Sequence, residues 1–290
     1  MGPYRTISAV GRILGRLSFF LLLALFSISH AGSIRFSSKS GLVMVPVWID
    51  NRVQGEFGID TGADKLYIDS SFAEENRIDF ETEGQRYNVY GIDGFSGAYE
   101  TTLKWFELGD NRLTDQPATV INMRRMTRSD QGIPDGLIGH DVLSQFYVTV
   151  DYENNRLDLD KYRPQFVSGK QYRELRFDSH WHLILLDVTI NDSLTVPMIL
   201  DYGASVTSIS PDLAAQAGHN AGAGEIFRLG SLAIDSKSRV TDVPTLVADY
   251  AAYREKFPRA AFEGILGATY LEHVKITVDY ERDLLYIVDK

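Results

Sequence analysis

Four short segments of this 290-residue chain recur later in the same order, and this repetition constrains the fold more than any other feature. A repeat of this length indicates a duplicated domain, because the repeats of solenoid proteins are much shorter. We therefore predict two similar lobes, residues 32–163 and 164–290, with a linker at residues 161–172. The repeated pairs are Gly58-Ile-Asp-Thr-Gly-Ala63 with Ile199-Leu-Asp-Tyr-Gly-Ala204, Leu113-Thr-Asp-Gln-Pro117 with Val240-Thr-Asp-Val-Pro244, Asp135-Gly-Leu-Ile-Gly139 with Glu263-Gly-Ile-Leu-Gly267, and Val148-Thr-Val-Asp-Tyr-Glu153 with Ile276-Thr-Val-Asp-Tyr-Glu281.

The spacing between the copies is unequal, and the inequality locates an insertion. The first pair is 141 residues apart and the second pair is 127 apart, so the first copy is longer by 14 residues between these segments. The extra residues fall around Tyr87 to Ala98, where Gly91, Gly94 and Gly97 cluster. This segment predicts an elongated β-hairpin that is complete only in the first lobe, with an ordinary surface hairpin as the alternative.

Composition and local patterns favour a mainly β fold with short helices. The chain contains 24 Gly, 15 Tyr and 15 Phe, and 44% of its residues are hydrophobic. We expect strands at Leu42 to Ile49 and Leu183 to Ile190, each followed by a turn and a second strand. Ser210 and Pro211 predict the start of a short helix in the second lobe. Ser71 to Glu74 resembles a capping box in the first lobe.

The first 31 residues have the features of a secretory signal peptide. Three arginines precede an apolar run from Leu17 to Ile28, and Ser29-His-Ala31 offers small residues at the positions that a signal peptidase recognises. We expect cleavage after Ala31 and export to the periplasm or the exterior, without stable membrane insertion. An uncleaved membrane anchor is the alternative, and the short apolar run argues against it.

The charge and the absence of cysteine exclude several classes of function. Removal of the three arginines in residues 1–31 changes the formal charge from −10 to −13 at pH 7. Nucleic acids and anionic membrane surfaces are therefore not expected as general partners. A chain with no Cys has no disulfides, no thiol nucleophile and no Cys-type zinc site, so its core alone must stabilise it.

Each copy carries an Asp-x-Gly-Ala loop after an apolar strand and an apolar segment flanked by glycines further along. Because this combination occurs twice, the chain resembles the pepsin/retropepsin superfamily of aspartic peptidases, especially bacterial retropepsin-like proteins with two fused lobes. The resemblance extends from about Gly41 to the end of the chain. It implies a mainly β, bilobal fold in which two barrel-like lobes are related by a pseudo-twofold axis.

The resemblance also implies the residues of an active site. Asp60 and Asp201 would form a catalytic pair that activates a water molecule, and a peptide or protein would be the substrate. Thr61, Gly62, Tyr202 and Gly203 would form and brace the two loops. Tyr90 and Gly91 would lie near a hairpin flap, and neither a cofactor nor a metal is expected. Because one chain supplies both halves of the site, a monomer is favoured.

Tyr202 departs from the family pattern, in which Thr or Ser follows the aspartate. Thr61 carries the hydroxyl that braces the opposite loop, whereas the hydroxyl of a tyrosine lies far from its backbone. The second copy also has Thr269 where the first has Asp141. Two alternatives remain open: an inactive protein that binds peptides, and an enzyme that forms its site from the first lobes of two chains.

Other polar clusters are weaker candidates. His180 and His182 would lie on one face of a strand and could begin a metal site, but no third ligand is visible in the sequence. Arg124, Arg125 and Arg128 form a small basic cluster that we interpret as a solvated loop, with selection of acidic substrate side chains as the alternative. The sequence has no phosphate-binding glycine loop, dinucleotide fingerprint or Gly-x-Ser-x-Gly elbow.

Overall fold

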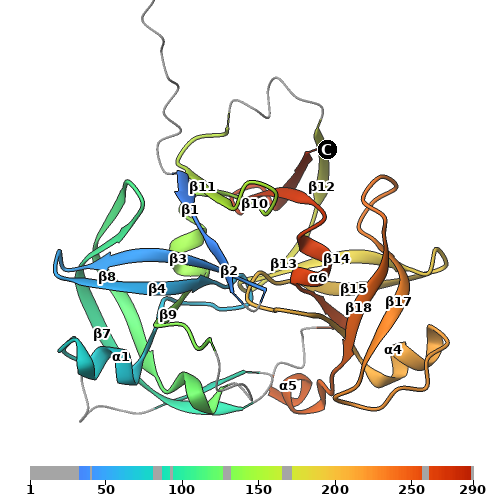
Figure 1. Cartoon of the computed structure of the whole chain (residues 1–290), viewed down its shortest axis with the longest axis horizontal. Helices are drawn as coiled ribbons and strands as arrows, with labels where there is room; N and C mark the ends of the chain where they lie inside the picture. Colours follow the sequence, from blue (N-terminus) through green and yellow to red (C-terminus); the bar gives the residue numbers. More distant parts are fainter. Residues whose placement is uncertain are drawn as a thin grey trace, which may run out of the picture.

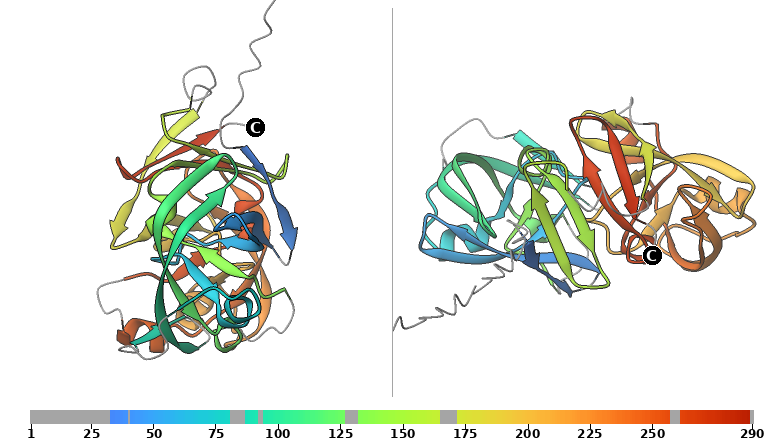
Figure 2. Two further views of the ribbon diagram at one scale, coloured as in Figure 1. Left: turned by 90° about the vertical axis from the view of Figure 1, so that its left-hand side faces the viewer. Right: turned by 90° about the horizontal axis from the view of Figure 1, so that it is seen from above.

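β-strands dominate the computed structural model, which describes residues 33–39, 41–80, 87–91, 94–126, 132–164, 172–256 and 261–288. The expected signal peptide and its cleavage site lie outside these residues, as does most of the expected linker. Two halves lie side by side (Figures 1 and 2), with short helices at their edges. The fold is therefore mainly β and bilobal, as predicted. No helix in the described part of the chain is long and apolar enough to cross a membrane.

The first half contains an eight-stranded sheet in the order β2-β3-β4-β9-β5-β8-β7-β6, and β3 also pairs with β7, which curls the sheet into a barrel-like shape. The 3-10 helix η1 (Met123–Arg125) and the helices α1 (Ser70–Glu75) and α2 (His140–Leu143) accompany it. The strands are β2 (Ser37–Lys39), β3 (Leu42–Ile49), β4 (Val53–Ile59), β5 (Tyr67–Asp69), β6 (Tyr87–Tyr90), β7 (Phe95–Leu108), β8 (Asn111–Ile121) and β9 (Gly136–Ile138).

The second half repeats this order in a seven-stranded sheet, β13-β14-β15-β19-β16-β18-β17, and β14 also pairs with β17. Among the described residues the sheet has no counterpart of β6. The helices are α4 (Pro211–Gln216), α5 (Ala251–Lys256) and α6 (Ala268–Leu271). The strands are β13 (Asp178–His180), β14 (Leu183–Ile190), β15 (Leu194–Leu200), β16 (Thr207–Ile209), β17 (Ile226–Ala233), β18 (Val240–Val247) and β19 (Gly264–Leu266).

A six-stranded sheet joins the halves, in the order β1-β11-β10-β20-β21-β12. At its centre β10 and β20 run antiparallel, and Thr149 lies opposite Thr277 with their hydroxyl oxygens 2.7 Å apart. These threonines are equivalent in the repeat, so this contact marks the pseudo-twofold axis. In Figure 1 the sheet lies on the side opposite α5. Its strands are β1 (Ser33–Arg35), β10 (Tyr147–Asp151), β11 (Arg156–Asp160), β12 (Tyr172–Arg176), β20 (Lys275–Asp279) and β21 (Leu284–Val288).

Local sequence rules predicted the strands β3 and β14 and the cap of α4, but not the cap of α1. The strands β3 and β14 have the predicted bounds, and Ser210 caps α4 by accepting the N–H of Leu213 at 3.2 Å. The capping box expected at Ser71 is wrong. Asp69 is the N-cap of α1, because its carboxylate accepts the N–H groups of Ser71 and Phe72. A carboxylate two residues earlier therefore takes the role that the hydroxyl was expected to play.

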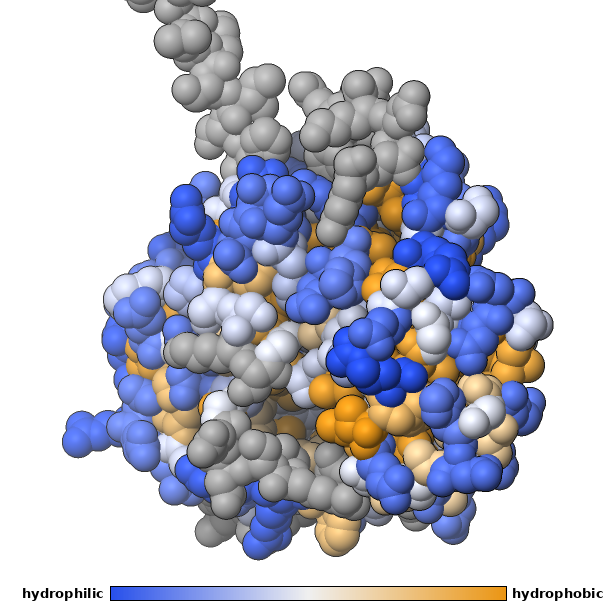
Figure 3. All heavy atoms as spheres, turned by 45° about the vertical axis from the view of Figure 1, so that its right-hand side comes forward, coloured by the Kyte–Doolittle hydropathy of each residue, from blue (hydrophilic) through white to orange (hydrophobic). Residues whose placement is uncertain are grey.

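A continuous apolar core stabilises both halves. The largest cluster of buried side chains runs from Ile34 to Ile287 and includes residues of all three sheets described above. The burial of these apolar side chains is the main contribution to stability in a chain without disulfides. On the face in Figure 3 most side chains are hydrophilic, and hydrophobic ones gather near its middle.

Candidate functional site

The two Asp-x-Gly loops leave equivalent strands of the two sheets. Asp60 follows β4, and its N–H donates to the carbonyl of Ile138 in β9 at 3.0 Å. Asp201 follows β15, and its N–H donates to the carbonyl of Leu266 in β19, also at 3.0 Å. In each half the glycine-flanked apolar segment is thus the parallel neighbour of the strand that delivers the aspartate. This pairing explains why the two motifs occur together in each copy.

The loops meet so closely that their glycines and aspartates share hydrogen bonds. The N–H of Gly62 lies 2.9 Å from Oδ1 of Asp60 and 3.2 Å from Oδ1 of Asp201. The N–H of Gly203 donates to Oδ1 of Asp201 at 2.7 Å. The two carboxyl groups also hydrogen-bond to each other, and both aspartates keep some surface accessible to solvent.

Only glycine fits at the two inner positions of the loops. A Cβ added to Gly62 would lie 2.9 Å from Oδ2 of Asp201, and one added to Gly203 would lie 2.4 Å from Cγ of Asp60. Each glycine therefore packs against the carboxylate of the opposite loop, and an alanine at either position would push the aspartates apart. Neither backbone has a positive φ, so close approach, not backbone conformation, is the reason for glycine here.

Thr61 braces the contact between the halves from the first loop. Its side chain is fully buried, its Oγ1 donates to the carbonyl of Leu200 at 2.9 Å, and the same oxygen accepts the N–H of Tyr202 at 3.1 Å. One hydroxyl thus satisfies two backbone groups of the opposite loop. Loss of either bond would destabilise the fold, because it would leave a buried polar group unpaired.

Tyr202 does not make the corresponding bonds from the second loop. Its ring is 1% exposed and packs near Tyr152, with the ring centroids 6.3 Å apart. Its hydroxyl is buried and has no hydrogen-bond partner among the described residues. Burial, followed by the neighbouring Tyr152 and Tyr280, raises the pKa of Tyr202 well above its usual value. Tyr202 therefore acts as an apolar packing residue behind the loops.

The environment raises the pKa of both loop aspartates. Burial and then the negative charge of Asp201 raise the pKa of Asp60 far above its usual value of 3.8. Burial also raises the pKa of Asp201, but the Gly203 N–H and the hydrogen bond from Asp60 oppose this effect. The two carboxyl groups therefore share one proton and titrate as a pair, which presents one acid and one base to solvent.

The glycine-rich hairpin begins beside the first loop. Lys65, five residues after Asp60, lies with its Nζ 3.3 Å from the hydroxyl of Tyr87 in β6. Near the tip, Gly91 donates to the carbonyl of Gly94 at 2.8 Å. A Cβ on Gly91 would lie 3.0 Å from Cε of Met126, so the tip packs on the end of η1. Tyr90 is 39% exposed and packs against Phe95.

Several other polar residues do not form the sites considered from the sequence. His180 ends β13 and Trp181 makes the turn with a φ of 60°, so His180 and His182 do not share a strand. Arg124 and Arg125 lie in η1, whereas Arg128 lies outside the described residues. Within the described ranges, no three His, Asp or Glu side chains are arranged to hold a metal ion.

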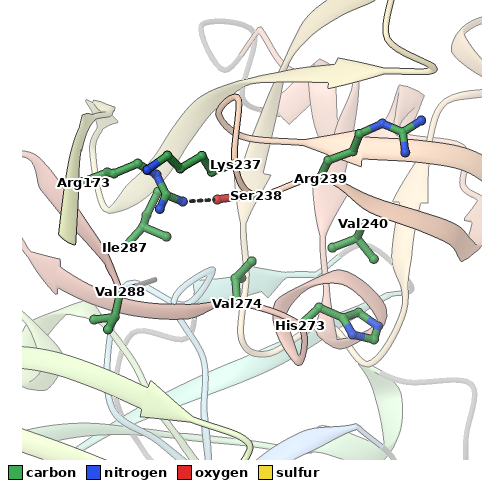
Figure 4. A pocket seen from close by; sticks show the side chains of 9 residues that line it. All are labelled: Arg173, Lys237, Ser238, Arg239, Val240, His273, Val274, Ile287 and Val288. Atoms are coloured by element: carbon green, nitrogen blue, oxygen red, sulfur yellow. Dashed lines mark hydrogen bonds between the residues drawn. The ribbon is translucent and has the colours of Figure 1, made fainter. Parts of the chain in front are cut away.

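A cavity of about 510 Å³ is lined by residues of the second half of the chain (Figure 4). Among its polar lining residues, Arg173 binds Asp235 and Ser238, and Arg239 binds Asp192. None of its lining residues belongs to either Asp-x-Gly loop. Its lining residues are Arg173, Lys237, Ser238, Arg239, Val240, His273, Val274, Ile287 and Val288.

Two histidines that the sequence did not place at this site also lie at the loops. Nε2 of His182 is 2.9 Å from the carbonyl oxygen of Gly62, and His140 packs edge-on against Tyr280 with the ring centroids 5.1 Å apart. The repeat contained a signal for both. Allowing for the two offsets, His182 corresponds to Gly41 and His140 corresponds to Ala268, so a titratable ring replaces a small residue at each position.

Comparison with known proteins agrees with this geometry. Residues 45–142 match the family model described as aspartyl protease. The match includes the Asp60 loop, the hairpin and the segment at Gly136 to Gly139, and it ends before the second half. No curated protein matches the chain significantly. The match confirms the resemblance to the pepsin/retropepsin superfamily and supports a protease-type function with peptide substrates.

Proposed function

We propose that this chain, which resembles the pepsin/retropepsin superfamily, is an aspartic endopeptidase in which Asp60 and Asp201 form the catalytic pair. The hydrogen bond between the two carboxyl groups, beside the Gly62 N–H that both approach, is the observation that supports this most directly. Two carboxyl groups that hydrogen-bond to each other cannot both be ionised without a large electrostatic penalty, so they share a proton. Asp201 lies outside the segment that matches the family model, and its assignment rests on these contacts.

The proposed reaction uses the asymmetry of the pair. Ionised Asp201 takes a proton from a water molecule, and the water oxygen attacks the scissile carbonyl carbon. Asp60 donates its proton to the carbonyl oxygen, which leaves a tetrahedral diol. As the carbon–nitrogen bond breaks, the proton on Asp201 passes to the departing amine and a diol proton returns to Asp60. The pair is then restored without a covalent intermediate.

The surrounding residues hold this geometry in the proposal. Thr61 locks the two loops together, whereas Gly62 and Gly203 allow the carboxyl groups to approach. Tyr202 packs behind them. The hairpin that carries Tyr90 and Gly91 would close over an extended peptide and exclude water from the reaction.

Asp60→Asn and Asp201→Asn test the proposal. Each removes one proton-transfer group, and we expect hydrolysis of a mixed peptide library to fall by roughly 10²–10⁴-fold in each variant. Asp187→Asn is the matched control, because Asp187 is exposed on β14 and should leave hydrolysis unchanged. Hydrolysis at the wild-type rate in both Asp60→Asn and Asp201→Asn would falsify the assignment.

A protein that binds peptides without cleaving them is the alternative that Tyr202 favours, because the second loop lacks the bracing hydroxyl. It predicts peptide binding by calorimetry with no turnover at any pH. An enzyme built from the first halves of two chains is the other alternative. It predicts activity that rises with protein concentration and survives Asp201→Asn. The contact of Asp60 with Asp201 inside one chain supports the single-chain form.

We further infer that the chain arose by internal duplication and that it is exported. The matching strand orders of the two halves and the Thr149–Thr277 contact support a duplication with lobes at residues 32–163 and 164–290. The arginines and apolar run of residues 1–31 support export to the periplasm or the exterior. Amino-terminal sequencing of the protein recovered from the periplasm and medium of an expressing bacterium would test both the cleavage site and the location.

A further inference from the structure

The space beside the two loops is filled differently on the two sides of the pseudo-twofold axis. On one side Gly41 packs against Ser205 and Ala268, and a Cβ on it would lie 2.9 Å from the Ser205 carbonyl oxygen. The corresponding residues on the other side are His182, Asp64 and His140. Three groups that can carry charge thus occupy the place of a glycine, a serine and an alanine. This difference is specific to the side that contacts the Asp60 loop.

His182 hydrogen-bonds to Gly62, whose N–H lies against both aspartates. Its Nε2 lies 2.9 Å from the carbonyl oxygen of Gly62, while the N–H of Gly62 points at the carboxylates of Asp60 and Asp201. A carbonyl oxygen can only accept, so Nε2 carries a hydrogen and donates. A proton taken up from solution therefore binds at Nδ1, and the bond to Gly62 is present in both charge states of the ring.

We propose that His182 is a positioning residue that fixes Gly62 against the aspartate pair and, when protonated, keeps Asp201 as the ionised member of that pair. The inference rests on the proposed peptidase function for its kinetic consequence. The coupling between the charges of His182 and Asp201 does not depend on catalysis.

The groups that face His182 determine when it becomes charged. Burial lowers the pKa of His182, whereas Asp64, the Gly62 carbonyl and Asp201 raise it, so the net pKa lies below the usual 6.5. Burial and then the charge of His182 lower the pKa of His140, so the two rings do not both become cations easily. Tyr67 donates a hydrogen bond to Asp64 and holds that carboxylate in place.

The coupling acts in the acidic range. As the pH falls, His182 becomes a cation near Asp201, and this charge lowers the pKa of Asp201. Asp201 therefore stays ionised, and able to act as a base, to a lower pH than it would beside a neutral residue. The same interaction must raise the pKa of His182 by an equal amount, because coupling between two titrating groups is reciprocal.

His182→Gln separates the charge from the hydrogen bond, because glutamine can still donate to Gly62 but does not titrate. We expect the acidic limb of the kcat/KM profile to move to higher pH by about 0.5–1 unit, while the basic limb stays in place. His182→Ala removes both features and should also lower kcat. His273→Gln is the control, because His273 is exposed, pairs with Glu272 and should leave the profile unchanged. A His182→Gln profile that superimposes on the wild-type profile would overturn the proposal.

A titration independent of activity separates this inference from the proposed function. The His182 ring protons are followed by NMR in the wild type, in Asp201→Asn and in the control Asp187→Asn, and are assigned by their loss in His182→Gln. We expect the pKa of His182 to fall by about 0.5–1 unit in Asp201→Asn only. If it does not change, the inference is wrong whatever the protein cleaves. If it falls in a protein that cleaves no peptide, the inference holds and the proposed function fails.

Discussion

Gly203 lies so close to Asp60 that a Cβ on the glycine would sit 2.4 Å from the Asp60 Cγ. The contact joins residues 143 positions apart in the sequence and from different halves of the chain. The position of the Asp60 carboxyl group therefore depends on the backbone of the second loop. The geometry of the aspartate pair is therefore a property of how the halves pack together.

Gly203→Ala should abolish most activity while the chain still folds. The added methyl group would displace the Asp60 carboxyl or separate the loops, and a misplacement of about 1 Å is expected to cost about 10²-fold in rate. Gly222→Ala is the matched control, since its Cβ would meet only Oε1 of Glu225 at 3.5 Å. Peptidase assays together with circular dichroism check this prediction. Full activity in Gly203→Ala would contradict it.

Thr61→Val should lower the free energy of unfolding by about 2–4 kcal/mol. The substitution keeps the shape of the side chain but leaves the Leu200 carbonyl and the Tyr202 N–H without their partner in a buried site. Thr61→Ser keeps the hydroxyl and should cost much less. Urea denaturation of the three proteins measures the difference, and equal stability of the Val and Ser variants would show that the bracing bonds contribute little.

Tyr202→Phe should be as stable as the wild type or more stable. The Tyr202 hydroxyl is buried without a protein partner among the described residues, so its removal costs no internal hydrogen bond. Tyr202→Ser restores the hydroxyl typical of the family but leaves a large cavity, and it should cost about 3–5 kcal/mol. Thermal unfolding distinguishes the two variants. A large loss of stability in Tyr202→Phe would mean that the hydroxyl is satisfied by a partner that holds the loops.

Asp141→Asn should make the protein more stable at alkaline pH. Burial raises the pKa of Asp141 from 3.8 to about 6, so the folded state binds this proton more tightly than the unfolded state. The stabilisation is complete below about pH 3.8 and is lost as the pH rises through about 6. Asparagine removes the buried charge, and we expect a gain of about 1 kcal/mol at pH 8 after solvent screening.

Urea denaturation of wild type and Asp141→Asn at pH 4, 6 and 8 measures this effect. Asp187→Asn, at an exposed position, should show no such gain at any of these values. A difference between wild type and Asp141→Asn that does not vary with pH would exclude ionisation of Asp141 as its cause.

The repeat, the composition and local patterns in the sequence were together sufficient to predict the fold class and several local features. The strands β3 and β14, the cap at Ser210 and the resemblance to the superfamily follow from patterns within a few residues, since pattern and turn chemistry act locally. The cap of α1 was predicted two residues too late, because Ser71 and Glu74 have the spacing of a capping box, whereas Asp69 at the end of β5 accepts the N–H groups of the helix. The hairpin at Tyr90 and Gly91 was located, but its packing on Met126 was not.

Tertiary structure alone decided how the residues at the axis contact one another. The sequence placed Asp60 and Asp201 in equivalent loops, but their mutual hydrogen bond and raised pKa values arise from burial between two halves. The sequence marked Tyr202 as an exception, and only the packing revealed it as a buried ring beside Tyr152. His182 entered the site through a contact with a residue 120 positions away. Periodicity and motif spacing record local preferences, whereas charge, proton sharing and bracing depend on distances across an interface that no local pattern encodes.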